Sequence, residues 1–174
     1  MNHQDHLAFL REGIPGQGGT WADLGSGTGA FTLALADLIG PTGQIYSVDR
    51  DQGALREQEK AMHARFPSTT VHYLAADFTS RLNLPLLDGV VMANSLHFVR
   101  QKEPVVHLVR SYLQPGGRLI IVEYNADRGN PWVPYPFSYG TWEIVARQCG
   151  FANTRLLATR PSRFFGEMYS AVSL

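Results

Sequence analysis

An apolar strand-like run that breaks directly into alternating glycines constrains the fold of this chain more than any other feature. The run Thr20–Leu24 carries Asp23 near its end, and Gly25, Gly27 and Gly29 follow it. Glycine lets the backbone adopt left-handed angles there, and it lets a ligand approach with no Cβ in the way. A helix that starts after the glycines would offer unpaired N–H groups to an anionic or polar ligand group. The pattern therefore predicts a strand, a tight turn and a helix that together hold a ligand.

The rest of the chain alternates strand-like apolar runs with helical periodicity, which is typical of a parallel α/β sheet. Val105, Leu108, Val109, Tyr112 and Leu113, for example, follow the i, i+3, i+4, i+7, i+8 spacing of an amphipathic helix. The expected helices cover residues 3–12, 29–39, 51–66, 102–113 and a last segment ending at 150. The expected strands cover residues 20–24, 44–48, 70–75, 86–93, 118–124, 154–158 and 164–171.

Two strand-like segments in a row close the chain, whereas a pure βα repeat would close with a helix. Short connections join antiparallel strands, while parallel strands need a crossover. We therefore expect five parallel strands, a sixth after the last helix, and a seventh that pairs antiparallel. The chain has 174 residues and no linker, so residues 1–174 are expected to form one domain, with a short helix within 1–13 and a core over 19–174.

Composition and charge exclude several classes of partner. The 15 basic and 15 acidic residues cancel, so no general field attracts nucleic acid or an anionic membrane. The single Cys149 excludes an intrachain disulfide and every cysteine-rich metal motif. The polar N-terminus lacks the apolar core of a signal peptide, and no apolar run approaches the roughly 20 residues of a membrane helix. We expect a cytoplasmic protein without metal, nucleic-acid partner or membrane insertion.

Five motifs, in order along nearly the whole chain, resemble those of class I S-adenosylmethionine-dependent methyltransferases. The resemblance is to the broad small-molecule type that includes the quinone-biosynthesis methyltransferases. The motifs are Asp23–Gly29, Ile45–Asp49, Ala75–Phe78, Asp88–His97 and Leu113–Leu119. The resemblance implies a three-layer Rossmann-like α/β fold with a seven-stranded sheet in the order 3-2-1-4-5-7-6, parallel except for the antiparallel last strand. It also implies S-adenosylmethionine as cofactor and S-adenosylhomocysteine as product.

A dinucleotide-binding domain is the strongest rival, because Gly25-x-Gly27-x-x-Ala30 fits its fingerprint and Asp49 lies near the expected offset of about 20 residues. A second acid at Asp77, the Pro-Gly-Gly turn before the fifth parallel strand, and the closing hairpin favour the methyltransferase. The tyrosine four residues before a lysine that short-chain dehydrogenases use is absent. An NAD(P)-dependent oxidoreductase and a non-catalytic module that binds S-adenosylmethionine remain the alternatives.

The resemblance gives each cofactor residue a role. Asp49, with Arg50 beside it, would accept from the ribose hydroxyls, and Asp77 from the adenine amino group, with Phe78 near the ring. The glycine turn would hold the methionine tail, and Asp23 would meet its ammonium. The implied cofactor residues are Asp23, Gly25, Ser26, Gly27, Thr28, Gly29, Asp49, Arg50, Asp77, Phe78, Asn94 and Ser95. The alternative for each aspartate is a helix cap or turn residue.

The residues after the fourth strand bear on the acceptor. His97 is the candidate general base, since its ordinary pKa suits proton transfer at neutral pH, and the alternative is that it caps or packs over the cofactor edge. The segment Asn94–His97 lacks the Asn/Asp-Pro-Pro-aromatic motif of base-amine methylases, and Cys149 lies outside this region. We therefore expect a small organic acceptor, methylated at O, N or C.

An aromatic and proline-rich loop over residues 125–140 is expected above the carboxyl edge of the sheet. Tyr124, Arg128, Trp132 and Tyr135 are the candidate acceptor-binding residues, because aromatics make apolar walls and arginine holds carboxylate or phosphate. The alternative is that these rings pack the loop onto the sheet. Only 22 residues precede Asp23, so a lid like that of many relatives would be short. The pocket would be open, closed by a second copy in a homodimer, or suited to a bulky acceptor.

Overall fold

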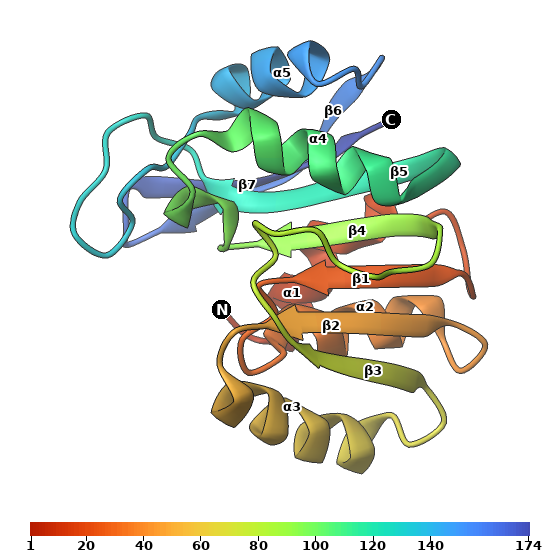
Figure 1. Ribbon diagram of the computed structural model, residues 1–174. Coiled ribbons are helices and arrows are strands. Elements are labelled where there is room, and N and C mark those ends of the chain that lie inside the picture. The colour runs from red at the N-terminus through yellow and green to blue at the C-terminus, as the bar shows by residue number, and fades with distance from the viewer.

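Seven strands form a single sheet in the computed structural model, which describes residues 1–174 (Figure 1). The strands are β1 (Thr20–Leu24), β2 (Gln44–Asp49), β3 (Thr70–Ala75), β4 (Leu87–Ala93), β5 (Leu113–Tyr124), β6 (Thr154–Ser162) and β7 (Gly166–Ser173). Their order is β3-β2-β1-β4-β5-β7-β6, and β1 to β5 are parallel. β7 runs antiparallel to both β5 and β6. The predicted architecture is therefore confirmed, including its reversed last strand.

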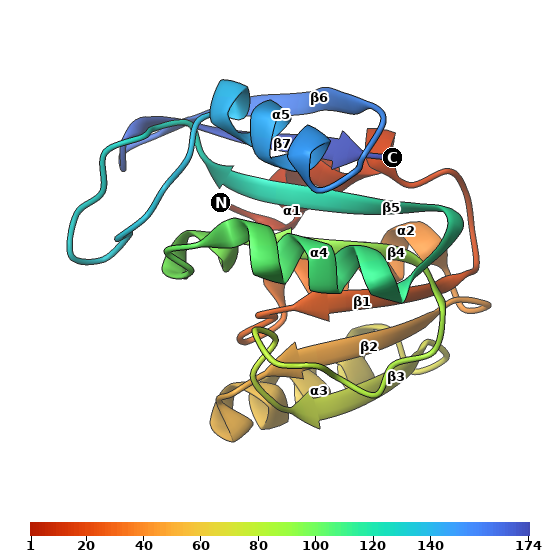
Figure 2. The same cartoon turned by 45° about the horizontal axis from the view of Figure 1, so that its top comes forward.

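Helices cover both faces of this sheet (Figure 2). They are α1 (His3–Leu10), α2 (Ala30–Ile39), α3 (Gln52–Arg65), α4 (Lys102–Tyr112) and α5 (Tyr139–Gln148). α1, α2 and Met62 of α3 pack on one face, and α4 and α5 pack on the other. Trp21 and Ala22 belong to opposite core clusters because successive side chains of a strand point to opposite faces. None of the five helices combines the length and the apolar character that crossing a membrane requires.

Several boundaries differ from the expected ones. α1 ends at Leu10 and continues as a 3₁₀ turn over Arg11–Gly13. β5 starts at Leu113 instead of residue 118, because Leu113 already pairs with Leu87 ahead of a register shift. Phe164, expected in the last strand, lies in the turn between β6 and β7, where Phe165 and Gly166 both have positive φ. Local pattern did not reveal these boundaries, because pairing across the sheet decides where each strand begins.

The carboxyl ends of the parallel strands meet at one edge of the sheet. The chain runs outward from β1 through β2 to β3 and then returns to the other side of β1 with β4 and β5. This reversal of direction between β1 and β4 is the point at which open α/β sheets bind ligands. The loop after β5 and the β6–β7 turn extend from the same edge, on the left of Figure 1. The sequence motifs therefore converge there.

Candidate functional site

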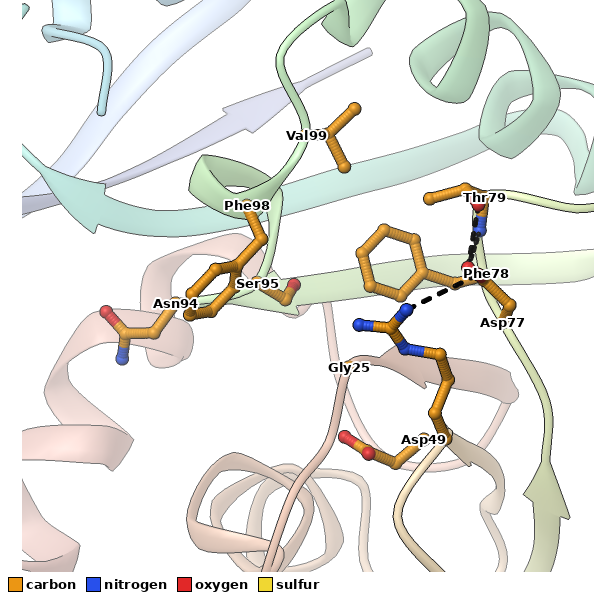
Figure 3. Close-up of a pocket in the computed structure, with 10 residues that line it drawn as sticks. Gly25, Asp49, Asp77, Phe78, Thr79, Asn94, Ser95, Phe98 and Val99 are labelled. Carbon is orange, nitrogen blue, oxygen red and sulfur yellow. Dashed lines mark hydrogen bonds and ion pairs between the residues drawn. The ribbon is translucent and has the colours of Figure 1, made fainter. Parts of the chain in front are cut away.

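A cavity of about 330 Å³ opens at this edge, between the ends of β1, β2 and β4 and the segment that follows β3 (Figure 3). Its lining residues are Gly25, Asp49, Arg50, Asp77, Phe78, Thr79, Asn94, Ser95, Phe98 and Val99. The sequence predicted seven of these ten as cofactor residues. It missed Thr79, Phe98 and Val99, which directly follow predicted residues in the two segments. A volume of this size lies at the lower end of the range for small-molecule sites.

Two glycines of the turn after β1 touch side chains that leave no room for a Cβ. Gly25 has φ +79°, and a Cβ there would lie 2.4 Å from the Ser95 Cβ. Gly29 has φ +90°, and a Cβ there would lie 2.3 Å from Cγ of Gln58. Both the backbone conformation and the packing therefore require glycine at these two positions. The backbone N–H groups of Gly25 and Ser26 donate to the Val48 carbonyl, which ties the turn to β2.

Asp49 ends β2 and points toward the glycine turn. Its Oδ2 accepts from the Gly27 N–H at 2.8 Å, and its Oδ1 accepts from the Asp51 N–H at 2.9 Å. A carboxylate has about four lone-pair sites, so each oxygen keeps capacity for another donor. Asp49 therefore both supports the turn and presents acceptors to the cavity.

Asp77 forms a small turn of its own after β3. Its Oδ1 accepts from the Thr79 hydroxyl at 2.7 Å and from the Thr79 N–H at 2.9 Å. These bonds from the hydroxyl and the N–H hold the pKa of the Asp77 carboxyl below its ordinary value, so the group is ionised at neutral pH. Oδ2 lies 3.7 Å from Arg50 Nη1, an exposed pair of little energetic weight. Asp77 can therefore stabilise its turn through Oδ1 and still bind a ligand through Oδ2, which has no hydrogen-bond partner.

Asp23 lies behind the turn and outside the cavity lining, with 1% of its surface exposed. Its Oδ2 accepts from the Thr32 hydroxyl at 2.6 Å. Burial raises the pKa of the Asp23 carboxyl to about 7; the Thr32 bond opposes this shift, and Asp49 adds to it. The remaining turn residues, Ser26, Gly27, Thr28 and Gly29, also lie beside the cavity and not in its lining.

Asn94 and Ser95 bring the end of β4 into the cavity. Asn94 has φ +53°, which is uncommon outside glycine and is concentrated at functional sites. Its side-chain Oδ1 is buried and has no hydrogen-bond partner. The Ser95 hydroxyl donates to the Leu24 carbonyl at 2.8 Å and so ties β4 to β1. Figure 3 shows the rings of Phe78 and Phe98 on different sides of Ser95. Asn94 thus combines a left-handed backbone with a buried, unpaired Oδ1 at the end of β4.

His97 is buried beside the cavity and is held by Glu123, the next-to-last residue of β5. Nδ1 of His97 lies 2.7 Å from Oε2 of Glu123. Oε1 accepts from the backbone N–H groups of Leu96 and His97 at 3.0 and 3.2 Å. A carboxylate oxygen accepts hydrogen bonds, so the contact with Oε2 orients the ring with Nδ1 toward Glu123 and Nε2 away from it. Sequence reasoning missed Glu123, although a single acid at the end of an apolar strand was a usable signal.

The loop after β5 divides the four predicted acceptor residues into two pairs. Tyr124 lies between His97 and Phe165, with ring centroids 5.8 and 5.5 Å away, and the Tyr135 N–H donates to the His97 carbonyl. Trp132, by contrast, is 71% exposed, and Arg128 is also exposed. The packing of the loop onto the sheet comes from Val133 and Phe137, which are buried. Tyr124 at the end of β5 and the backbone of Tyr135 therefore contact His97, whereas Arg128 and Trp132 are exposed.

Comparison with known proteins identifies the family of this chain. The profile of the family described as "Methyltransferase domain" matches residues 16–151. The ubiquinone/menaquinone biosynthesis C-methyltransferase UbiE of Ectopseudomonas mendocina (strain ymp) is 30% identical over 124 residues, which are 67% of this chain and 48% of that protein. The chain spans about half the length of the curated relatives it matches.

Solved structures share the fold over nearly the whole chain. The YcgJ protein from Bacillus subtilis superposes with a TM-score of 0.78 at 12% identity and covers 98% of each chain. A SAM dependent methyltransferase from Aquifex aeolicus superposes with a TM-score of 0.74 at 18% identity, over 97% of this chain and 88% of that one. These likenesses confirm the predicted Rossmann-like methyltransferase fold. The Aquifex aeolicus protein is described as dependent on SAM.

Proposed function

The chain belongs to the methyltransferase-domain family, and on that premise we propose that it transfers a methyl group from S-adenosylmethionine to a small organic acceptor. The observation that carries the proposal is that Gly25, Asp49, Asp77 and Asn94 line the same cavity. These residues come from four separate segments, and each presents a group that one part of the cofactor needs. The product is S-adenosylhomocysteine.

The residues of the cavity fit the cofactor in chemical type. Asp49 has acceptor capacity for the ribose hydroxyls, Asp77 Oδ2 for the adenine amino group, and the Phe78 ring for the adenine face. The glycine turn lies where the methionine tail would extend, and Asn94 and Ser95 line the cavity beside it. Asp23, ionised, would neutralise the tail ammonium from behind the turn. Because Gly25 has no side chain, the backbone of the turn is open to the methionine tail.

The chemistry that the cofactor supplies is an electrophilic methyl carbon on a sulfonium, which becomes a neutral thioether after transfer. The protein's own residues align the acceptor and exclude water, and this alignment can supply most of the acceleration. An acceptor that holds its proton at neutral pH also needs a base. We propose His97 for this role, because Glu123 contacts Nδ1 and so fixes the orientation of the ring. Replacing His97 with Gln should then slow the methylation of protonated acceptors by roughly 100-fold or more.

The acceptor itself is proposed by class. UbiE is named for C-methylation in quinone biosynthesis. The similarity to UbiE and a cavity of about 330 Å³ both support a small organic acceptor. Phe98, which lines the cavity, is exposed, and so are Trp132 and Tyr135 of the loop after β5. They support a second copy of the chain as the lid, in a cytoplasmic homodimer. Sedimentation of the protein with and without S-adenosylhomocysteine tests this, and a monomer under both conditions would refute it.

Calorimetric titration with S-adenosylhomocysteine tests the proposal directly. We expect one site per chain with a dissociation constant on the order of 1 μM, or about −8 kcal/mol. A folded protein that does not bind the ligand would refute the assignment, and binding of NAD(H) instead would favour the oxidoreductase. Incubation with methyl-labelled cofactor and a metabolite extract separates an enzyme from a non-catalytic binding module. An enzyme transfers the labelled methyl group to a product, whereas a binding module leaves the label on the cofactor.

A further inference from the structure

Gln58 is a buried polar residue on a helix that is otherwise mostly exposed. It lies on α3 with 0% of its surface accessible, on the same face as the buried Leu55 and Met62. These three residues follow the i, i+3, i+7 spacing of a core-facing stripe. A glutamine in such a stripe needs a reason, because burial of an amide costs free energy unless it is hydrogen-bonded.

The amide oxygen of Gln58 holds two hydroxyls beneath the glycine turn. Oε1 accepts from Ser47 Oγ of β2 at 2.9 Å and from Ser26 Oγ of the turn at 3.4 Å. The two hydroxyls lie 2.7 Å from each other. Ser26, at the crest of the turn, is thus connected through its side chain to both β2 and α3.

The stem of Gln58 supports the turn sterically as well. A Cβ on Gly29 would lie 2.3 Å from Cγ of Gln58, so the glutamine is packed directly against the last residue of the turn. The amide nitrogen Nε2, however, is buried and has no hydrogen-bond partner. Half of this amide is therefore unfavourable where it lies.

An apolar residue would fill the space that Gln58 occupies equally well. Methionine has a similar length and flexibility, would make the same contact with Gly29, and would bury no unpaired donor. What glutamine adds over methionine is its amide oxygen, which accepts from Ser26 and Ser47. Ser26 belongs to the glycine turn and Ser47 contacts Ser26, so both contacts of the oxygen affect the conformation of this turn.

We infer that Gln58 is a positioning residue for the methionine tail of the cofactor, and that it acts through the glycine turn. This inference rests on the proposed function, in which that turn holds the tail. The adenosine half would be held by Asp49, Asp77 and Phe78, none of which contacts Gln58 through a hydrogen bond. Gln58 should therefore select for ligands that carry the amino-acid tail.

Two ligands separate the tail from the rest. S-adenosylhomocysteine carries the tail, while 5′-methylthioadenosine has the same adenosine and thioether without it. Gln58→Met should weaken binding of S-adenosylhomocysteine by about tenfold and leave 5′-methylthioadenosine within about twofold of the wild type. The melting temperature of the ligand-free variant should stay equal or rise, because the unpaired donor is gone. A merely structural role would instead lower both affinities and the melting temperature together.

Gln52→Met is the matched control, because Gln52 is an exposed glutamine on the same helix and should change neither affinity. An equal loss for both ligands, or no loss for either, overturns the role of Gln58. If Gln58→Met does not fold, Ser47→Ala removes the bridging hydroxyl and should show the same selective loss. A wild-type protein that binds neither ligand refutes the proposed function, whereas one that binds both equally well refutes only the tail site.

Discussion

Glu123 accepts hydrogen bonds from the ring of His97 and from its backbone N–H, and neither side chain is more than 3% exposed. One carboxylate thus holds the turn after β4 and orients the only histidine beside the cavity. Replacing it with alanine would leave the N–H groups of Leu96 and His97 unpaired. We expect Glu123→Ala to lower the free energy of unfolding by about 2–3 kcal/mol, measured by denaturant titration.

Glu57→Ala provides the comparison for that experiment, because Glu57 is an exposed glutamate on α3. It should change the free energy of unfolding by less than about 0.5 kcal/mol. Similar midpoints for the two variants would mean that the Glu123 contacts contribute little to folding.

Asp23 makes stability depend on pH. Its pKa is about 7 in the folded protein and 3.8 in a free chain, because burial favours the protonated form. The unfolded chain therefore ionises first, and stability falls as pH rises from about 4 to 7, by on the order of 4 kcal/mol at most. Asp23→Asn keeps an acceptor for Thr32 and removes this loss. The variant should match the wild type at pH 4 and exceed it at pH 8 in denaturant titrations.

The same substitution should weaken cofactor binding, since an asparagine cannot neutralise an ammonium. Calorimetry at pH 8 with S-adenosylhomocysteine should show lower affinity for Asp23→Asn despite its greater stability. A variant that gains stability equally at pH 4 and pH 8 would disprove a raised pKa at Asp23.

Gly25 and Gly140 predict opposite effects for the same substitution. At Gly25 an added Cβ meets Ser95 at 2.4 Å in a backbone with φ +79°, so alanine should destabilise the fold by about 2 kcal/mol or more and abolish ligand binding. Gly140 lies in the first turn of α5 with nothing within 4 Å of an added Cβ. Alanine there should stabilise by up to about 1 kcal/mol. Thermal denaturation of both variants checks the contrast, and a stable, binding-competent Gly25→Ala would contradict the packing argument.

Asp49 should be the single most important carboxylate for the ribose. Asp49→Ala removes two acceptors from the cavity and frees the Gly27 N–H, so S-adenosylhomocysteine affinity should fall by roughly 10- to 100-fold. Asp37→Ala is a suitable control because Asp37 is exposed on α2 and outside the cavity. Equal affinities of the two variants in calorimetry would remove the ribose assignment.

Much of this site could be predicted because its residues directly follow apolar strands. Asp49 ends β2, Asp77 and Asn94 follow β3 and β4, and parallel strands bring their carboxyl ends to one edge. Thr79 and Phe98 were missed for a different reason. They belong to short turns whose side-chain directions depend on local bonds, such as the bond from Thr79 to Asp77, and these leave no period in the sequence.

The sequence by itself determined the α/β alternation, the glycine turn and the reversed last strand, because hydrophobic periodicity and backbone freedom are properties of local segments. The tertiary structure alone decided which polar residues support which loop. Gln58 reaches the turn from a helix 29 residues beyond Gly29, and Glu123 reaches His97 from the neighbouring strand 26 residues later. Such contacts depend on the crossing of elements in space and on the burial of both partners. Burial is also what moves the pKa of Asp23 to about 7, and no local pattern encodes it.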